Sequence, residues 1–178
     1  MKSILFCLFS TFVFSSMNVG LCNAIATTAV SHEQSKLEPF MDALFIEDLQ
    51  AAQEIIDSGF DINQRLEDGT TILFFTVYFG APSSVVNFLI ESGADVNGQT
   101  LYTYTPLYAS VFNTDYELTK ILLESGANPN IKFTEIRDSQ IRELTVLSLA
   151  KKYAQNYPET PKVQQLIKLL LSFGALEY

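Results

Sequence analysis

The sequence has little cysteine, histidine and positive charge, and each shortage excludes a class of function. Two cysteines and one histidine occur in 178 residues, and Lys and Arg total 11 against 20 Asp and Glu, a formal net charge of −9. No cluster of Lys and Arg is present to follow a phosphate backbone, which argues against nucleic acid as a partner. No glycine-rich phosphate loop or metal-spaced set of His, Cys and Asp occurs either. We therefore expect no cofactor and no metal.

Long hydrophobic runs are also missing, and the main apolar run lies at the N-terminus. Lys2 precedes an apolar run from Ile4 to Phe14, which is short of the roughly 20 residues needed to cross a hydrocarbon core. Small residues follow at Ala24 and Ala26. This order of features predicts a secretory signal peptide over residues 1–26, with cleavage after Ala24 or Ala26.

Two alternatives to a cleaved signal peptide remain open, an uncleaved membrane anchor and a lipoprotein acylated on Cys22. The bulky Leu21 departs from the small residue that a lipobox expects at that position. Cleavage would remove both cysteines and Lys2, which leaves 10 basic and 20 acidic residues, a net charge of −10. A cysteine-free exported chain without an Asn-x-Ser/Thr site favours a bacterial periplasm over an animal extracellular space. We expect a periplasmic or secreted protein with no stable membrane anchor.

The rest of the chain repeats one seven-residue phrase. It reads DSGFDIN at 57–63, ESGADVN at 91–97 and ESGANPN at 124–130, and its glycines are 34 and then 33 residues apart. A fixed period of this size indicates a repeat architecture.

Each repeat also contains the signals that begin and end helices. Thr71, Thr105 and Thr145 each open an apolar segment, and Pro106 follows Thr105. Threonine is a good N-cap, and proline suits the first helical position because no N–H is needed there. A second helix with apolar residues at helical spacing follows, and Gly126 can take the left-handed conformation that ends it.

The segment Thr105–Asn130, TPLYASVFNTDYELTKILLESGANPN, resembles the ankyrin repeat family, whose units open with TPLH and close with GADVN. The resemblance covers residues 37–178. It implies an all-α solenoid of about four helix-turn-helix repeats with short β-turn fingers. The implied units are about 37–70, 71–104, 105–144 and 145–178.

The chain departs from the family pattern in two ways. Ile72 and Val146 replace the proline, and Phe74, Tyr108 and Ser148 replace the histidine that braces neighbouring turns. These changes leave the fold intact and predict looser networks between the turns.

The first and last units are irregular. We place the start of the first helix at Pro39, because the residue before proline avoids helical geometry, and we expect residues 27–36 to be a flexible leader. The last unit contains 15 extra residues. Seven of them enlarge the finger Ile131–Leu144, and eight separate the helices around Gln155–Lys162, where two prolines prevent a continuous helix.

Catalysis has little support in the sequence. Asp48, Asp115 and Glu117 offer carboxylates for acid–base chemistry, but two of them, Asp115 and Glu117, lie where ankyrin-like helices begin, and acidic side chains there favour the helix dipole. We expect a protein that is not an enzyme, with a carboxylate-dependent hydrolase as a remote alternative.

Binding to another protein has more support. The resemblance implies a concave groove lined by the fingers and by the exposed ends of the first helices, and exposed aromatic residues gathered on one face mark interaction sites. Some of these rings, Phe79 and Phe112 above all, could instead fill core gaps left by the missing histidines. The expected partner-binding residues are Phe45, Ile46, Arg65, Glu67, Tyr78, Phe79, Tyr102, Tyr104, Phe112, Asn113, Phe133, Glu135, Arg137 and Tyr153.

These features together predict an exported protein–protein interaction module. Its expected role is that of an inhibitor or immunity protein that neutralises a periplasmic toxin or enzyme, and the acidic charge favours a basic partner. The alternative is a protective or assembly helper of an envelope enzyme.

Overall fold

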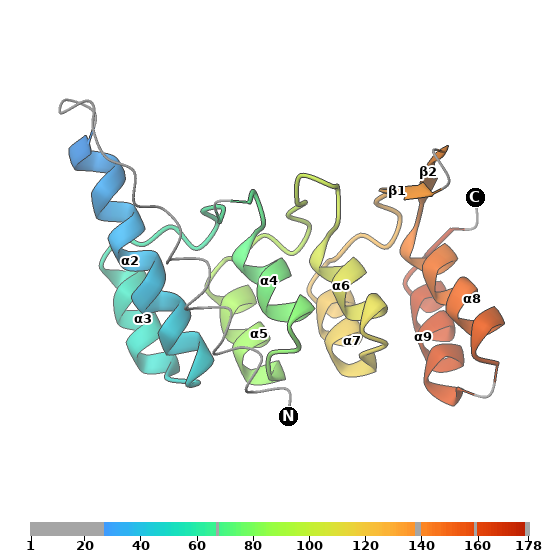
Figure 1. Ribbon diagram of the computed structural model, residues 1–178. Helices are drawn as coiled ribbons and strands as arrows, with labels where there is room; N and C mark the ends of the chain where they lie inside the picture. The colour runs from blue at the N-terminus through green and yellow to red at the C-terminus, as the bar shows by residue number, and fades with distance from the viewer. Residues whose placement is uncertain (1–26, 67, 138–139, 159, 177–178) are drawn as a thin grey trace.

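The computed structural model describes residues 27–66, 68–137, 140–158 and 160–176. This part of the chain contains eight helices and one two-stranded sheet, arranged as a row of helix pairs (Figure 1). The predicted signal peptide lies outside the described residues. The helices are α2 Thr27–Phe45, α3 Leu49–Asp57, α4 Ile72–Tyr78, α5 Ser83–Glu91, α6 Pro106–Phe112, α7 Tyr116–Glu124, α8 Val146–Asn156 and α9 Pro161–Ser172, and the strands are β1 Phe133–Arg137 and β2 Gln140–Leu144.

The predicted helix caps are present. The Oγ1 atoms of Thr71, Thr105 and Thr145 accept hydrogen bonds from backbone N–H groups three residues later, at 3.2, 3.2 and 3.4 Å. Each bond satisfies one of the N–H groups that have no partner inside the helix. Gly93 and Gly126, with φ of 93° and 90°, follow the ends of α5 and α7 in the left-handed conformation, so the threonines and glycines that recur in the sequence do begin and end helices.

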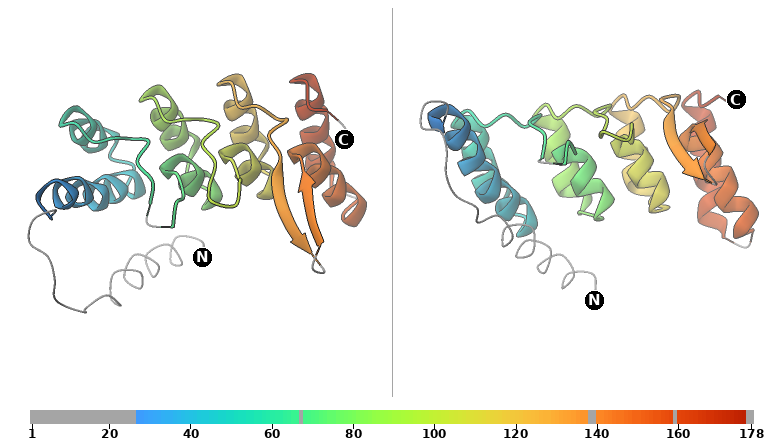
Figure 2. Two further views of the ribbon diagram at one scale, coloured as in Figure 1. Left: turned by 90° about the horizontal axis from the view of Figure 1, so that it is seen from above. Right: turned by 45° about the horizontal axis from the view of Figure 1, so that its top comes forward.

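The helices form two layers. The first helices α4, α6 and α8 contact one another in sequence, and the second helices α5, α7 and α9 contact one another behind them. Buried side chains between the layers, such as Leu73, Leu107 and Leu147, are each 1% exposed. The connecting turns and the hairpin β1–β2 project on the side of the first helices (Figure 2). The fold is therefore the predicted all-α solenoid, with the fingers projecting on the side of the first helices.

Asparagine side chains join each repeat to the next. Asn97 Nδ2 donates to the carbonyl of Gly126 at 3.2 Å, and Asn97 Oδ1 accepts from the N–H of Asn128 at 2.8 Å. Asn63 and Asn130 make the same pair of bonds to the next turn along the chain. The last residue of each repeated phrase thus links its turn to the next one, whereas the looser networks expected at the positions of the missing histidines stay a prediction.

The first helix begins earlier than predicted. Helix α2 starts at Thr27 and contains Pro39, so the start at Pro39 and the separate leader at 27–36 are wrong. Proline removes one intrahelical hydrogen bond, but contacts of the residues just before Pro39 hold the helix to the domain. Leu37 packs against the core, and Lys36 Nζ donates to the carbonyl of Ser58 at 2.7 Å.

The extra residues of the last unit lengthen its helices and its finger. Helix α8 has 11 residues where α6 has 7, and α9 has 12 where α7 has 9. The break between α8 and α9 occurs at the predicted prolines, with Pro161 as the first residue of α9. The enlarged finger is an antiparallel hairpin whose register pairs Phe133 with Leu144 and Arg137 with Gln140.

Candidate partner-binding face

Aromatic side chains from three repeats form one continuous surface on the side of the first helices and fingers. Tyr78 at the end of α4 and Phe112 at the end of α6 stack with ring centroids 5.9 Å apart. They lie 34 residues apart in the sequence, so the repeat places them at the same position of successive helices. We call this surface the aromatic face; it consists of Tyr78, Phe79, Tyr102, Tyr104, Tyr108, Phe112 and Tyr153.

The aromatic face continues from the helices onto the second finger, residues 99–104. Tyr108 stacks against Phe112 at 5.9 Å and against Tyr104 at 4.3 Å, and Tyr104 contacts Tyr102 at 6.3 Å. Tyr153 of α8 contacts Phe112 at 6.4 Å. Rings four residues apart on a helix lie on one side of it, and this spacing relates Tyr108 to Phe112.

Several of these rings are exposed. Tyr102 is 69% exposed, Phe79 41%, Phe112 40% and Tyr78 39%. Phe79 and Phe112 are thus not sealed in the core, which was the alternative open to them. Aromatic side chains that are half exposed and held by neighbouring rings lose little conformational freedom when a partner covers them.

Phe133, which was predicted to contact a partner, is buried in the structure. It is 4% exposed, and its ring meets that of Tyr108 edge to face at 4.6 Å. The position that holds histidine in the family pattern is occupied here by Tyr108, and the hairpin supplies Phe133 to pack against it. The prediction that Phe133 contacts a partner directly is therefore wrong, and its ring instead joins the hairpin to α6.

Burial changes the chemistry of the inner tyrosines. It raises the pKa of Tyr104, Tyr108 and Tyr153 above the ordinary value of 10.0, and the Glu135 carboxylate nearby raises them further. The phenols of Tyr104, Tyr108 and Tyr153 are therefore neutral hydrogen-bonding groups across the physiological pH range.

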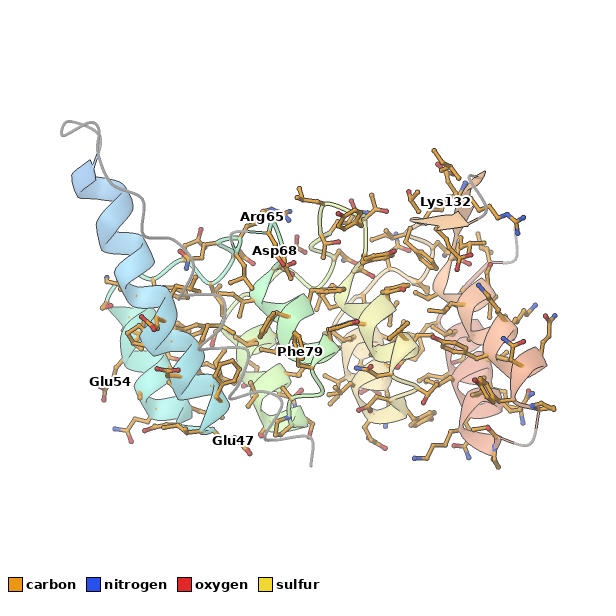
Figure 3. The ribbon with its side chains drawn as sticks, viewed as in Figure 1. Glu47, Glu54, Arg65, Asp68, Phe79 and Lys132 are labelled. Atoms are coloured by element: carbon orange, nitrogen blue, oxygen red, sulfur yellow. The ribbon has the colours of Figure 1, made fainter. Side chains whose placement is uncertain are left out.

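The fingers are held to one another by polar contacts. Arg65 Nη1, on the first finger (residues 65–71), donates to the carbonyls of Gly69 and Gln99 and so ties this finger to the second. Thr103 Oγ1 accepts from the N–H of Thr134 at 3.2 Å, which ties the second finger to the hairpin. Figure 3 shows Arg65 among the side chains above α4. Arg65, predicted as a contact, therefore has a bracing role in the structure.

The remaining predicted residues are spread over the fold. Glu135 pairs with Lys152 Nζ at 2.8 Å and fixes the hairpin to α8. The side-chain amide of Asn113 donates to the carbonyls of Val77 and Tyr78 at 3.1 and 2.9 Å and closes the end of α4. Ile46 is 75% exposed just beyond α2.

Phe45 ends α2 in the first repeat, outside the aromatic face. Glu67 and the side chain of Arg137 lie outside the described residues. The structure thus brings together six aromatic residues of the predicted set, namely Tyr78, Phe79, Tyr102, Tyr104, Phe112 and Tyr153.

Two shallow hollows border the aromatic face. The first, of about 400 Å³, lies between the first two fingers and is lined by Asp68, Thr70, Phe74, Thr100, Leu101, Tyr102 and Tyr104. The second, of about 360 Å³, lies near the end of α8 and is lined by Phe112, Thr114, Tyr153, Tyr157, Thr160 and Val163.

Sequence reasoning missed Asp68 and Thr100, which shape the first hollow. Asp68 Oδ1 accepts from the N–H of Thr70 at 2.9 Å, and Thr100 Oγ1 accepts from the N–H groups of Tyr102 and Tyr104 at 3.3 and 3.2 Å. Asp and Thr two residues before a free N–H favour such local bonds, a signal that could have placed both residues in tight turns.

Charge is divided unevenly along the chain. Residues 27–130 contain 15 acidic and 3 basic residues, a net charge of −12, whereas residues 131–178 contain 5 acidic and 7 basic residues, a net charge of +2. The first three repeats therefore carry the acidic character, and the hairpin and the last repeat do not.

The carboxylates considered for catalysis have structural roles. Asp48 Oδ1 accepts from the N–H of Ala51 at 3.0 Å at the start of α3, and Asp115 Oδ1 accepts from that of Leu118 at 3.0 Å at the start of α7. Among the residues that the structure describes, no three His, Cys, Asp or Glu side chains gather as a metal site would require. Within the same residues, no helix has the length and apolar character needed to cross a membrane.

Comparison with known proteins agrees with this geometry. The family model for ankyrin repeats (3 copies) matches residues 40–133. An ankyrin repeat protein of Borreliella burgdorferi is 26% identical over 115 residues, which are 65% of this chain and 52% of that protein.

Two further relatives match shorter parts of the chain. The RelA-associated inhibitor of Mus musculus is 30% identical over 97 residues, 53% of this chain and 12% of that protein. An ankyrin repeat protein of Acanthamoeba polyphaga mimivirus is 29% identical over 89 residues, 49% of this chain and 12% of that protein. The chain thus spans about half or less of the relatives that it matches.

Proposed function

This chain belongs to the ankyrin repeat family, and we propose that it is an exported inhibitor or immunity protein that binds and neutralises a periplasmic toxin or enzyme. Ankyrin repeats are protein–protein interaction modules, so the coarse function is binding. The observation that supports the proposal most is the aromatic face, a continuous set of rings, several of them about 40% exposed or more, on the side of the first helices and fingers. Such rings are the residue type that most often supplies binding energy at protein interfaces.

Neutralisation fits the construction of this face. The rings are held by one another and by buried neighbours, and the fingers are braced by Arg65 and Thr103. A preorganised surface binds with little loss of conformational entropy, which suits a protein that acts by occupying its target. The proposal also assumes that the predicted signal peptide directs this protein to the periplasm, where its target would be located.

The acidic first three repeats favour a basic partner. A net charge of −12 over residues 27–130 would accelerate encounter with a positively charged protein. The acceleration should weaken as the salt concentration rises, because the Debye length is only about 8 Å at physiological ionic strength and is shorter still at higher salt. The mouse relative is itself named as an inhibitor, which is a loose parallel.

The test is capture of the partner followed by two measurements. The exported protein is used to isolate its partner from the periplasm of its own source, or is mixed with the product of the neighbouring gene. The affinity of the pair is then measured for Tyr102→Ala plus Tyr104→Ala, with Phe173→Ala as the control, because Phe173 is 40% exposed at the end of the outer helix α9. We expect the double variant to bind at least about tenfold more weakly, since hot-spot aromatics contribute about 2 kcal/mol or more.

The activity of the captured partner separates the two functional alternatives. Loss of toxin or enzyme activity on adding one equivalent of this protein is the expected result. Protection or enhancement of that activity would favour the helper of an envelope enzyme instead. Unchanged affinity in a folded Tyr102→Ala plus Tyr104→Ala variant would contradict the assignment of the aromatic face.

A further inference from the structure

The first hollow has the features of a site for one cationic side chain. It is bordered on one side by the rings of Tyr102 and Tyr104, which are inclined by 34° with centroids 6.3 Å apart. Asp68 lies on the other side, on the first finger, and Figure 3 shows it below Arg65 above α4. Aromatic faces and a carboxylate are the two groups that attract a cation, the first through the ring quadrupole and the second through charge.

A hydrogen bond holds the Asp68 carboxylate in place. Its Oδ1 atom accepts from the N–H of Thr70, which fixes the orientation of the carboxylate. Within the part of the chain that the structure describes, Asp68 makes no ion pair. The nearest cationic residue along the chain, Arg65, has its Nη1 atom bound to the carbonyls of Gly69 and Gln99 and does not line the hollow.

Local hydrogen bonds fix the wall of the hollow that the second finger supplies. Thr100, 8% exposed, accepts hydrogen bonds from the N–H groups of Tyr102 and Tyr104 and so fixes the backbone that carries both rings. Leu101 is 73% exposed and lies over Gly69, where an added Cβ would come within 2.5 Å of its Cγ. The absence of a side chain at position 69 therefore lets Leu101 lie against this edge of the hollow.

We propose that this hollow binds the guanidinium group of an arginine side chain that the partner protein presents. A guanidinium is flat enough to stack on Tyr102 or Tyr104 while its N–H groups reach the Asp68 carboxylate, whereas an ammonium has no flat face. The charge of −12 over residues 27–130 favours a positively charged ligand. The inference rests on the proposed function, since it names the chemistry by which the partner is recognised.

The hollow can be tested without the partner, so that its failure and that of the proposed function are distinguishable. N-acetyl-arginine N-methylamide is titrated into the ¹⁵N-labelled protein, and the amide shifts of Gly69, Thr70 and Thr100 are followed. The citrulline analogue, which has nearly the same shape and no charge, is the ligand control. We expect saturable shifts centred on these amides, with binding of citrulline at least about fivefold weaker.

Matched variants separate the hollow from the general acidity of the surface. Asp68→Asn retains an oxygen that can accept from the N–H of Thr70, and it should weaken arginine binding by about fivefold or more, because the charge is lost. Asp95→Asn is the control: Asp95 accepts from the N–H of Asn97 at 2.9 Å in the same kind of turn but does not line the hollow. Its affinity for arginine should change by less than about twofold.

Several results would overturn the inference. Equal shifts with citrulline, equal binding by Asp68→Asn, or equal losses in both variants would remove the role of the carboxylate. Shifts spread over the outer acidic surface, or none at all, would mean that the hollow does not select a cation. Equal binding of N-acetyl-lysine N-methylamide would contradict stacking of a guanidinium.

Discussion

The asparagine that ends the second repeated phrase should hold two repeats together. In Asn97→Ala, the hydrogen bond from Nδ2 to the Gly126 carbonyl and that from the Asn128 N–H to Oδ1 are both lost. Each such bond contributes about 1 kcal/mol net, and partial exposure of Asn97 reduces the total. We expect the free energy of unfolding to fall by about 1–2 kcal/mol, and the melting temperature by about 2–8 °C for a domain of this size.

Urea unfolding followed by circular dichroism at 222 nm measures this change, because the helices dominate the signal. Asn87→Ala is the matched control. Asn87 is exposed on α5, and no hydrogen bond of its side chain occurs among the described residues. The free energy of unfolding of Asn87→Ala should therefore differ from that of the parent by less than about 0.5 kcal/mol. A loss of less than about 0.5 kcal/mol in Asn97→Ala would show that these bonds do not hold the turns together.

Three further predictions concern backbone geometry, pH and processing. Gly93→Val should destabilise the fold by about 1 kcal/mol or more through its left-handed φ of 93° alone, since nothing lies within 4 Å of the added Cβ. Gly93→Asn should destabilise it less in the same urea assay, because asparagine tolerates this conformation better than a β-branched residue. Because burial raises the pKa of Tyr108 above its value in the unfolded chain, the stability that this group contributes is complete below about pH 10 and is lost as the pH rises further. Tyr108→Phe should therefore lose less stability than the parent between pH 7 and about pH 11. The intact mass of the exported protein should place its N-terminus at Thr27 or Ile25, and an uncleaved chain or a lipid on Cys22 would contradict soluble export.

The repeat register was predictable because the residues that mark it have strong local conformational preferences. Thr105 and Thr145 cap helices, and Gly93 adopts a conformation that other residues disfavour, so their spacing locates the helices directly. The start of α2 was not predictable in the same way. The local rule for the residue before Pro39 favoured a helix start there, whereas the contacts of Leu37 and Lys36 with distant residues hold the helix through it.

The candidate face was predictable in part. The repeat implied that Tyr78 and Phe112 would occupy equivalent positions, and they stack. The burial of Phe133 was not visible in the sequence, because it depends on the hairpin folding back onto Tyr108. The role of Asp68 depends likewise on the second finger lying beside the first.

Photocrosslinking from two positions tests most directly whether the aromatic face contacts the partner. The photoreactive residue p-benzoylphenylalanine replaces Tyr102 in one variant and Phe173 in the other, so that an exposed aromatic ring is exchanged for another ring in both. After irradiation of cells that export the protein, we expect a discrete crosslinked species from position 102 and none from position 173. A crosslinked species from position 173 alone would place the contact on the outer helices and contradict binding at the aromatic face.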